Sequence, residues 1–178
     1  MNTRPLAVLM SGAPGSGKST LARALGEALR LPVIDKDRLR EGARFTLGID
    51  NFDEAPRGVE LFYATMEAIL GQRISVIGDM TLYPGISEPD IAARLAPRAT
   101  LFNVHCVAAN ATARFEARMR ADPLNRGRVD ALLPQVVGLN ARLAEPLDLG
   151  CPCIVVDTAD GYAPSIAEIA AVIRQGVA

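Results

Sequence analysis

The sequence predicts an α/β fold in which five parallel strands form one sheet with helices packed on both faces. The first observation is that short apolar runs alternate with longer helix-like stretches along the chain. Such alternation is typical of βαβ units. The second is that these runs are rich in Val, Ile and Leu and mostly uninterrupted, as expected of strands covered on both sides. The third is the length of 178 residues, which suits one domain, so we expect residues 1–178 to form a single domain.

Each expected strand is a short apolar run, and the expected helices fill the intervals between them. The first run, LAVLM, stops at a glycine-rich segment, and the amphipathic stretch STLARALGEALR follows it. The second, third and fifth runs end in an aspartate. Ser87 with Asp90 three residues later predicts a capping box at a helix start. The expected strands are Leu6–Ser11, Pro32–Asp35, Ile74–Asp79, Thr100–Cys106 and Cys153–Asp157. The expected helices are Lys18–Arg30, Asp37–Arg44, Arg57–Gly71, Glu88–Ala96, Ala111–Ala121, Val129–Ala144 and Ser165–Gln175.

The composition is that of an ordinary globular chain. Hydrophobic residues make up 49% and charged residues 22%, the net charge is −1 and the pI is about 5.9. Because there is no basic surplus, a nucleic-acid partner is not expected. No apolar run is long enough to span a membrane, and the N-terminal apolar run predicts a strand rather than a signal peptide. Three cysteines without such a signal favour reduced thiols in the cytoplasm.

Cys151-Pro-Cys153, together with Cys106 and His105, invites comparison with a metal site. The spacing matches no standard zinc pattern. In a parallel sheet Cys106 would end one strand and Cys153 begin another, so the two would lie at opposite edges. We therefore interpret these cysteines as small apolar residues near strand ends, and His105 as a core histidine.

The most specific motif is the glycine-rich loop between the first strand and the first helix. It fits G-x-x-x-x-G-K-[ST] at every fixed position, in the strand–loop–helix context that the motif requires. Glycines let the backbone wrap around an anion, and the helix N-terminus adds a partial positive charge. We expect Lys18 to reach the β- and γ-phosphates of ATP and the Ser19 hydroxyl to bind Mg²⁺. The expected nucleotide-binding residues are Gly12, Ala13, Pro14, Gly15, Ser16, Gly17, Lys18, Ser19 and Thr20.

The loop indicates a nucleoside triphosphate without fixing the reaction. No N/T-K-x-D element of guanine recognition is present in the sequence. The chain is also too short for the machinery of an oligomeric ATPase. A small ATP-dependent phosphotransferase is the natural match to this size.

The charged stretch IDKDRLREGAR, residues 34–44, follows the second expected strand. Residues just past the carboxyl end of a strand line the ligand crevice of an α/β sheet. Asp37 is there a candidate for orienting or deprotonating an acceptor hydroxyl, and Arg40 for gripping the acceptor. Asp35 competes with Asp37 for the role of base. The alternative is that Asp37 is only a helix N-cap and that Arg40 belongs to a solvated face.

GAPGSGKST followed by IDKDRLRE resembles the small P-loop kinases of the polynucleotide-kinase, zeta-toxin and chloramphenicol-phosphotransferase type. The resemblance implies a three-layer P-loop NTPase fold with a helical lid. It implies that Asp37 and Arg40 form an Asp-x-x-Arg element of general base and acceptor contact. It also implies that Asp79, in the stretch IGDMT, helps to hold the acceptor or the metal. Glu145-Pro-Leu matches an element that is frequent late in such chains.

The same resemblance places the lid at about residues 112–130, where the sequence reads RFEARMRADPLNRGR from residue 114. Arg118 matches the family's first lid arginine, which neutralises charge that develops during transfer. The place of the second lid arginine holds Ala121-Asp122, a departure that leaves its identity open. The candidate lid arginines are Arg114, Arg118, Arg120, Arg126 and Arg128. The alternative is a surface helix whose arginines pair with Glu116 and solvent.

These observations predict a kinase that transfers the γ-phosphoryl group of ATP, with Mg²⁺, to a hydroxyl of a small-molecule acceptor. Lys18, Asp37 and Arg118 are the expected catalytic residues, and Asp37, Arg40 and Asp79 the expected acceptor-binding residues. The alternatives are a nucleic-acid 5′-hydroxyl kinase and a regulatory protein that binds ATP without transferring its γ-phosphoryl group. By fold analogy, residues 158–162 line the base. The acceptor and the oligomeric state carry no signature in the sequence.

Overall fold

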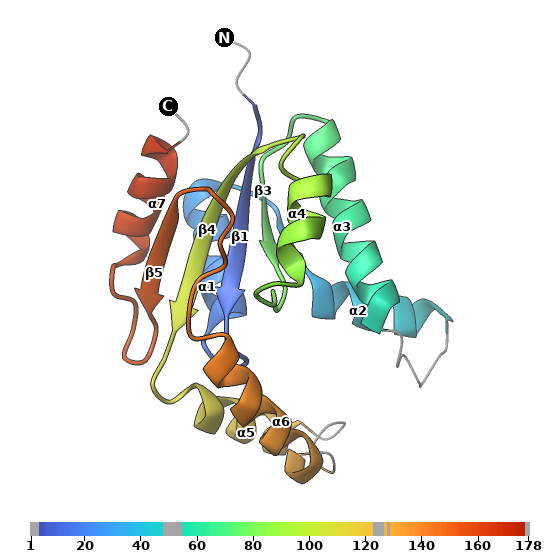
Figure 1. Cartoon of the computed structure of the whole chain (residues 1–178), viewed down its shortest axis with the longest axis vertical. Coiled ribbons are helices and arrows are strands. Elements are labelled where there is room, and N and C mark those ends of the chain that lie inside the picture. The colour runs from blue at the N-terminus through green and yellow to red at the C-terminus, as the bar shows by residue number, and fades with distance from the viewer. Residues whose placement is uncertain (1–3, 48–54, 123–126, 128, 177–178) are drawn as a thin grey trace.

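The computed structural model describes residues 4–47, 55–122, 127 and 129–176 of the chain. Its elements follow one another as β and α units, and Figure 1 shows the sheet between two layers of helices. The strands are β1 (Leu6–Gly12), β2 (Val33–Asp35), β3 (Val76–Asp79), β4 (Thr100–Val107) and β5 (Cys153–Asp157). The helices are α1 (Lys18–Leu29), α2 (Lys36–Leu47), α3 (Ala55–Gly71), α4 (Ser87–Arg94), α5 (Ala111–Ala121), α6 (Val129–Arg142) and α7 (Ile166–Gln175).

The five strands form one sheet in the order β2-β3-β1-β4-β5, and every neighbouring pair is parallel. This confirms the predicted α/β fold of the P-loop NTPase type. Because all strands run in one direction, their carboxyl ends meet at one edge of the sheet. Asp35 of β2 pairs in register with Asp79 of β3. Asp35 and Asp79 are therefore neighbours at this edge. The phosphate loop follows β1, the strand on the other side of β3.

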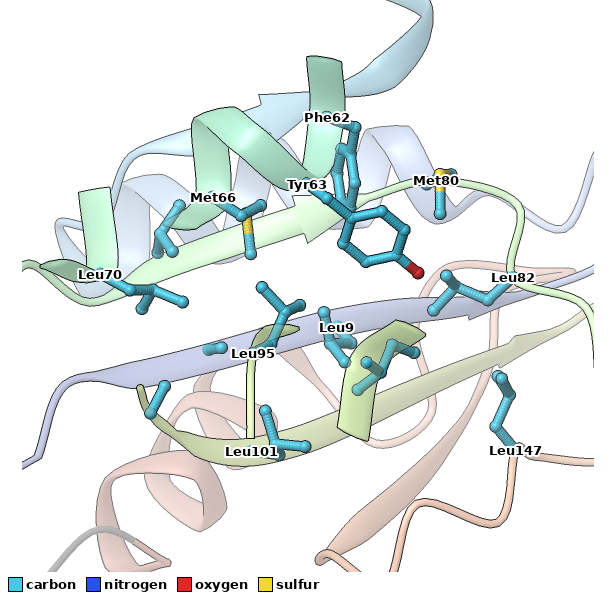
Figure 2. Packing of buried hydrophobic residues seen from close by; sticks show 14 residues of the cluster. Leu9, Phe62, Tyr63, Met66, Leu70, Met80, Leu82, Leu95, Leu101 and Leu147 are labelled. Carbon is cyan, nitrogen blue, oxygen red and sulfur yellow. The ribbon is translucent and has the colours of Figure 1, made fainter. Parts of the chain in front are cut away.

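Two hydrophobic clusters hold the helices to the sheet, one on each face. Alternation along β1 supplies both clusters, because Leu9 points to one face while Val8 and Met10 point to the other. Figure 2 shows the cluster on the face of α3 and α4, where Leu9 lies between Tyr63 and Leu95. The opposite cluster joins the sheet to α1 and α7. The helices on both faces of the sheet thus fix the position of the carboxyl edge of the sheet through these two clusters.

Two local expectations are corrected by the structure. The capping box at Ser87 is wrong, because the Ser87 hydroxyl accepts a hydrogen bond from the backbone N–H of Tyr83 at 2.9 Å. The N-cap of α4 is Ile86, which makes no side-chain cap bond. A true capping box lies instead at Ser165 and Glu168, at the start of α7. The third strand begins at Val76 rather than at Ile74, whose side chain is exposed.

The helices α5 and α6 form a hairpin beyond the carboxyl edge of the sheet (Figure 1). This is the place of the predicted helical lid. The end of α6 returns to the body of the protein through a segment in which Leu147 is buried in the cluster of Figure 2. Among the described residues, none of the helices is long and apolar enough to cross a membrane.

Candidate active site

The phosphate loop takes its shape from three glycines with positive φ angles. Gly12, Gly15 and Gly17 have φ values of 121°, 85° and 83°, which residues other than glycine rarely adopt. A Cβ on Gly12 would lie 2.2 Å from the Cys106 carbonyl oxygen, and one on Gly15 would lie 2.0 Å from that of Ala111. The loop therefore packs against β4 and α5 in a way that only glycine permits.

Lys18 is the first residue of α1, and its side chain reaches back to the phosphate loop. Its ammonium donates a hydrogen bond to the Ala13 carbonyl oxygen at 2.8 Å. Burial lowers the pKa of Lys18, while the nearby Asp79 carboxyl group opposes this shift. The ammonium therefore lies inside the loop that the motif assigns to phosphates.

Asp79, at the end of β3, lies beside Ser19. Asp79 is 4% exposed, and its carboxyl group and Ser19 line the same cavity. Burial raises the pKa of Asp79, and the nearby Ser19 hydroxyl and the charge of Lys18 work against that rise. No group of three acidic, His or Cys residues that could hold a metal exists in the described part of the chain. One carboxylate and one hydroxyl nevertheless fit Mg²⁺, which takes few protein ligands and completes its shell with phosphate oxygens and water.

At the junction of β2 and α2, two aspartates take different roles. The Asp35 carboxylate accepts hydrogen bonds from the backbone N–H groups of Asp37, at 2.9 Å, and Arg38, at 3.2 Å. Asp35 is thus the residue that caps the helix, and Asp37 is not. Asp37 instead presents a carboxylate whose oxygen lies 3.0 Å from the Lys36 Nζ and 3.7 Å from an Arg40 Nη.

Two opposing effects set the pKa of Asp37. Although 63% of the Asp37 side chain is exposed, partial desolvation by its surroundings works to raise the pKa. The charge and hydrogen bond of Lys36, followed by the charges of Arg40 and Arg118, outweigh this effect and leave the pKa of Asp37 below its ordinary value. Asp37 is therefore a carboxylate at neutral pH, which is the form that can accept a proton.

One cavity of about 190 Å³ collects these groups. Of the predicted residues, it is lined by Lys18, Ser19, Asp37, Asp79 and Arg118 together with part of the loop backbone. Segments far apart in the sequence thus meet at one point. Sequence reasoning missed four further lining residues, which are Lys36, Met80, Thr81 and Phe115. The signal for Lys36 was available, since it stands between the two aspartates at the strand end.

Arg40 does not line this cavity. Its Nε is buried without a hydrogen-bond partner among the described residues, and its guanidinium faces Asp37 from one helical turn further along α2. It lies beside the candidate base.

The candidate lid arginines separate into different environments. Arg118 lines the cavity, with its guanidinium 5.7 Å from the centre of the Phe115 ring. Arg120 is turned away and pairs with Glu116 at 2.8 Å and with Asp130 at 3.1 Å on the surface. The surface-helix alternative therefore describes Arg120. Arg126 and Arg128 lie outside the described residues.

Arg114 connects the α5–α6 hairpin to the body of the protein. Its guanidinium donates to the Thr158 carbonyl oxygen at 2.9 Å and to the Thr158 hydroxyl at 3.3 Å. That hydroxyl in turn donates to the Ser16 carbonyl oxygen at 2.7 Å. The start of α5, the end of β5 and the phosphate loop are thereby joined by hydrogen bonds around Thr158, which is 4% exposed.

His105 lies in the sheet, away from the cavity. Its Nδ1 is 2.9 Å from the Ser11 hydroxyl and its Nε2 is 3.0 Å from the Ala144 carbonyl oxygen. The ring is buried, and both nitrogens have partners. His105 therefore joins β1, β4 and the end of the lid hairpin.

A family model described as an AAA domain matches residues 8–145, which include the phosphate loop, the β2–α2 junction and the lid. The chain belongs to this AAA-domain family.

Two curated relatives match parts of the chain. A protein-glutamate methylesterase/protein-glutamine glutaminase 1 from Anaeromyxobacter dehalogenans (strain 2CP-C) is 31% identical over 86% of this chain and 43% of its own length. A shikimate kinase from Thermobifida fusca (strain YX) is 54% identical over 37 residues, 21% of each protein. The chain thus spans less than half the length of either relative.

Several solved structures share the fold over nearly the whole chain. A protein of Chloroflexus aurantiacus J-10-fl, inferred to be a kinase, superposes with a TM-score of 0.76 at 24% identity, covering 98% of this chain and 97% of its own. The APS kinase of Mycobacterium tuberculosis, solved with AMPPNP and APS, gives a TM-score of 0.64 at 17% identity and covers 98% of both chains. A gluconokinase from Sinorhizobium meliloti 1021 gives 0.61 at 19%, covering 99% and 95%. These likenesses establish a P-loop kinase-like fold.

Proposed function

We propose that this protein is an ATP-dependent kinase that transfers the γ-phosphoryl group to a hydroxyl of a small-molecule acceptor. One observation carries the proposal, which is the meeting of Lys18, the Ser19–Asp79 pair and ionised Asp37 in a single cavity. Phosphate binding, a place for Mg²⁺ and a proton acceptor are the parts that phosphoryl transfer to a hydroxyl requires. The kinase-like fold agrees with this assignment.

Each residue has a role that follows from its position. The loop amides and Lys18 bind the β- and γ-phosphates, and Ser19 and Asp79 would hold Mg²⁺, which neutralises charge on the phosphates when it is bound. Asp37 orients the acceptor hydroxyl and accepts its proton, and Arg40 contacts the acceptor beside it. Arg118, from the lid, stabilises the charge that develops on the transferring group. The Asp37–Arg40 spacing also supports placing the chain near the polynucleotide-kinase and zeta-toxin group.

Two other functions remain candidates for comparison. A nucleic-acid 5′-hydroxyl kinase would need a basic channel lined with aromatic residues, and the net charge of −1 with 4% aromatic residues disfavours it. A regulatory protein that binds ATP without transferring it would have no need of an ionised Asp37 in the phosphate cavity. We therefore favour the small-molecule kinase, acting in the cytoplasm.

The first experiment measures ADP release from Mg·ATP with and without a panel of acceptors. The panel contains gluconate and other sugars, shikimate, adenosine phosphosulfate, nucleosides, aminoglycosides, phenicols, sugar nucleotides and short 5′-hydroxyl oligonucleotides. Stimulation by one class identifies the acceptor, and stimulation only by oligonucleotides would favour the nucleic-acid kinase.

The Asp37→Asn variant tests the base. We expect the affinity for ATP to stay within a few-fold of the wild type, and transfer to fall by about 10²-fold or more, because a positioned base contributes about that much. Asp35→Asn tests the competing aspartate, which also lines the cavity; because its carboxylate is held by the backbone N–H groups of Asp37 and Arg38, transfer should fall less than in Asp37→Asn. Equal losses of binding and transfer in Asp37→Asn would mean that Asp37 is structural.

A further inference from the structure

Lys36 is a cation at an unfavourable place in its helix. It is the first residue of α2, where the partial positive charge of the helix N-terminus disfavours cations and favours anions such as Asp37. Its side chain is 23% exposed, lines the phosphate cavity, and places its Nζ 3.0 Å from an Asp37 carboxylate oxygen. The position of Lys36 therefore indicates a role in the phosphate cavity rather than a contribution to the stability of α2.

The pairing of Lys36 with Asp37 limits what the carboxylate can do. A carboxylate held by an ammonium is a weaker proton acceptor than a free one. The same ammonium borders the cavity that contains Lys18 and the loop. A lysine has a flexible stem and three donors, and it is a common phosphate ligand. Lys36 can thus bind either of two anions, the Asp37 carboxylate or a phosphate in the cavity.

We propose that Lys36 is a positioning residue that couples nucleotide binding to Asp37, moving its ammonium from the carboxylate to the γ-phosphate when ATP occupies the cavity. This inference rests on the proposed kinase function. Released from Lys36, Asp37 accepts the proton of the acceptor hydroxyl. The acceptor oxygen then bonds to the γ-phosphorus, the bond from that phosphorus to the β,γ-bridging oxygen breaks, and ADP leaves with the electron pair.

The coupling is specific to Lys36 because the other groups near Asp37 are already engaged or lie further away. Lys18 donates a hydrogen bond to the Ala13 carbonyl oxygen, and the closest Arg40 nitrogen remains 3.7 Å from the carboxylate. The titratable and charged groups that face Asp37 from the surrounding elements are Lys18, Lys36, Arg40, Asp79, Tyr83 and Arg118.

The first test compares the binding of Mg·AMPPNP and Mg·ADP to the wild type and to Lys36→Met. A lost hydrogen bond between charged partners predicts about tenfold or more weaker binding of AMPPNP. ADP lacks the γ-phosphate, so its affinity should change less than about twofold. Lys36→Arg should retain most of the preference for AMPPNP. Arg38→Met is the matched control, because Arg38 pairs with Glu41 on the exposed side of the same helix.

The second test follows the titration of the Asp37 carboxyl group by ¹³C NMR, with and without Mg·AMPPNP. In the wild type the nucleotide should raise the pKa of Asp37, both by its own charge and by removing Lys36. In Lys36→Met this rise should be smaller, because only the charge of the nucleotide remains. An equal rise in both proteins, or an unchanged AMPPNP preference in Lys36→Met, would overturn the proposal.

Neither measurement requires transfer, so the two proposals can fail separately. A Lys36-dependent preference for AMPPNP in a protein that phosphorylates no acceptor would refute the kinase but retain the contact. A working kinase without that preference would refute the role of Lys36 alone.

Discussion

Thr158→Val tests whether hydrogen bonds around one buried hydroxyl hold the phosphate loop in place. The hydroxyl donates to the Ser16 carbonyl oxygen at 2.7 Å and accepts from Arg114 at 3.3 Å. Valine has nearly the same shape but cannot make either bond. Leaving a buried carbonyl without its donor costs about 1–3 kcal/mol, so we expect the free energy of unfolding to fall by that amount. The bond from Arg114 to the Thr158 carbonyl oxygen, at 2.9 Å, should survive.

The assay is thermal unfolding with and without Mg·ATP. At this chain length, each kcal/mol lowers the Tm by roughly 2–4 °C. Thr158→Ser is the control, because it keeps the hydroxyl and loses only a methyl group, worth about 0.8 kcal/mol when buried. We also expect Thr158→Val to weaken ATP binding more than Thr158→Ser does, because the loop that binds phosphate loses its anchor. Equal Tm values and equal ATP affinities for the two variants would refute the reasoning.

Two further predictions concern Lys18 and His105. Lys18→Ala should abolish tight ATP binding and turnover, because it removes the ammonium that lies inside the phosphate loop; unchanged turnover, measured by ADP release, would contradict the phosphate-loop assignment. Burial lowers the pKa of His105, and the hydrogen bond that its ring donates to the Ala144 carbonyl oxygen opposes this shift. Below pH of about 6.5 the unfolded chain therefore binds more protons at this residue than the folded one, and His105 should make stability fall on acidification. Melting curves between pH 7.5 and 5.5 should show a smaller loss of Tm in His105→Gln than in the wild type, and identical losses would exclude His105 as a cause.

Local patterns were enough to predict the fold and the phosphate loop. Apolar runs that alternate with amphipathic stretches specify parallel strands through burial alone, and the loop motif is contiguous. The helix period also brings Arg114 and Arg118 to related faces of α5 while it turns Arg120 away. These features depend on residues close in sequence.

The remaining features depend on contacts that spacing does not encode. Which aspartate caps α2 is decided by a helix start one residue earlier than expected, and that start assigns the cap to Asp35 and leaves Asp37 for the cavity. The bond between Thr158 and Ser16 spans 142 positions, so no local pattern reports it. The capping box was misplaced at Ser87 because the Ser87 hydroxyl accepts a hydrogen bond from the backbone N–H of Tyr83, in the preceding turn, instead of capping the helix.

The anchoring of α5 determines where the lid can bend. The Ala111 carbonyl lies against Gly15, and Arg114 is tied to Thr158, so the first turn of α5 moves with the phosphate loop. Any closing motion must then pivot beyond Arg114. Arg118 lies one helical turn further, roughly 6 Å along the axis, and a rotation of about 20° at that pivot would displace its backbone by only about 2 Å. If the α5–α6 hairpin closes as a lid, it is therefore a short lever, which would move Arg118 by about the length of one hydrogen bond and leave the loop at its base undisturbed.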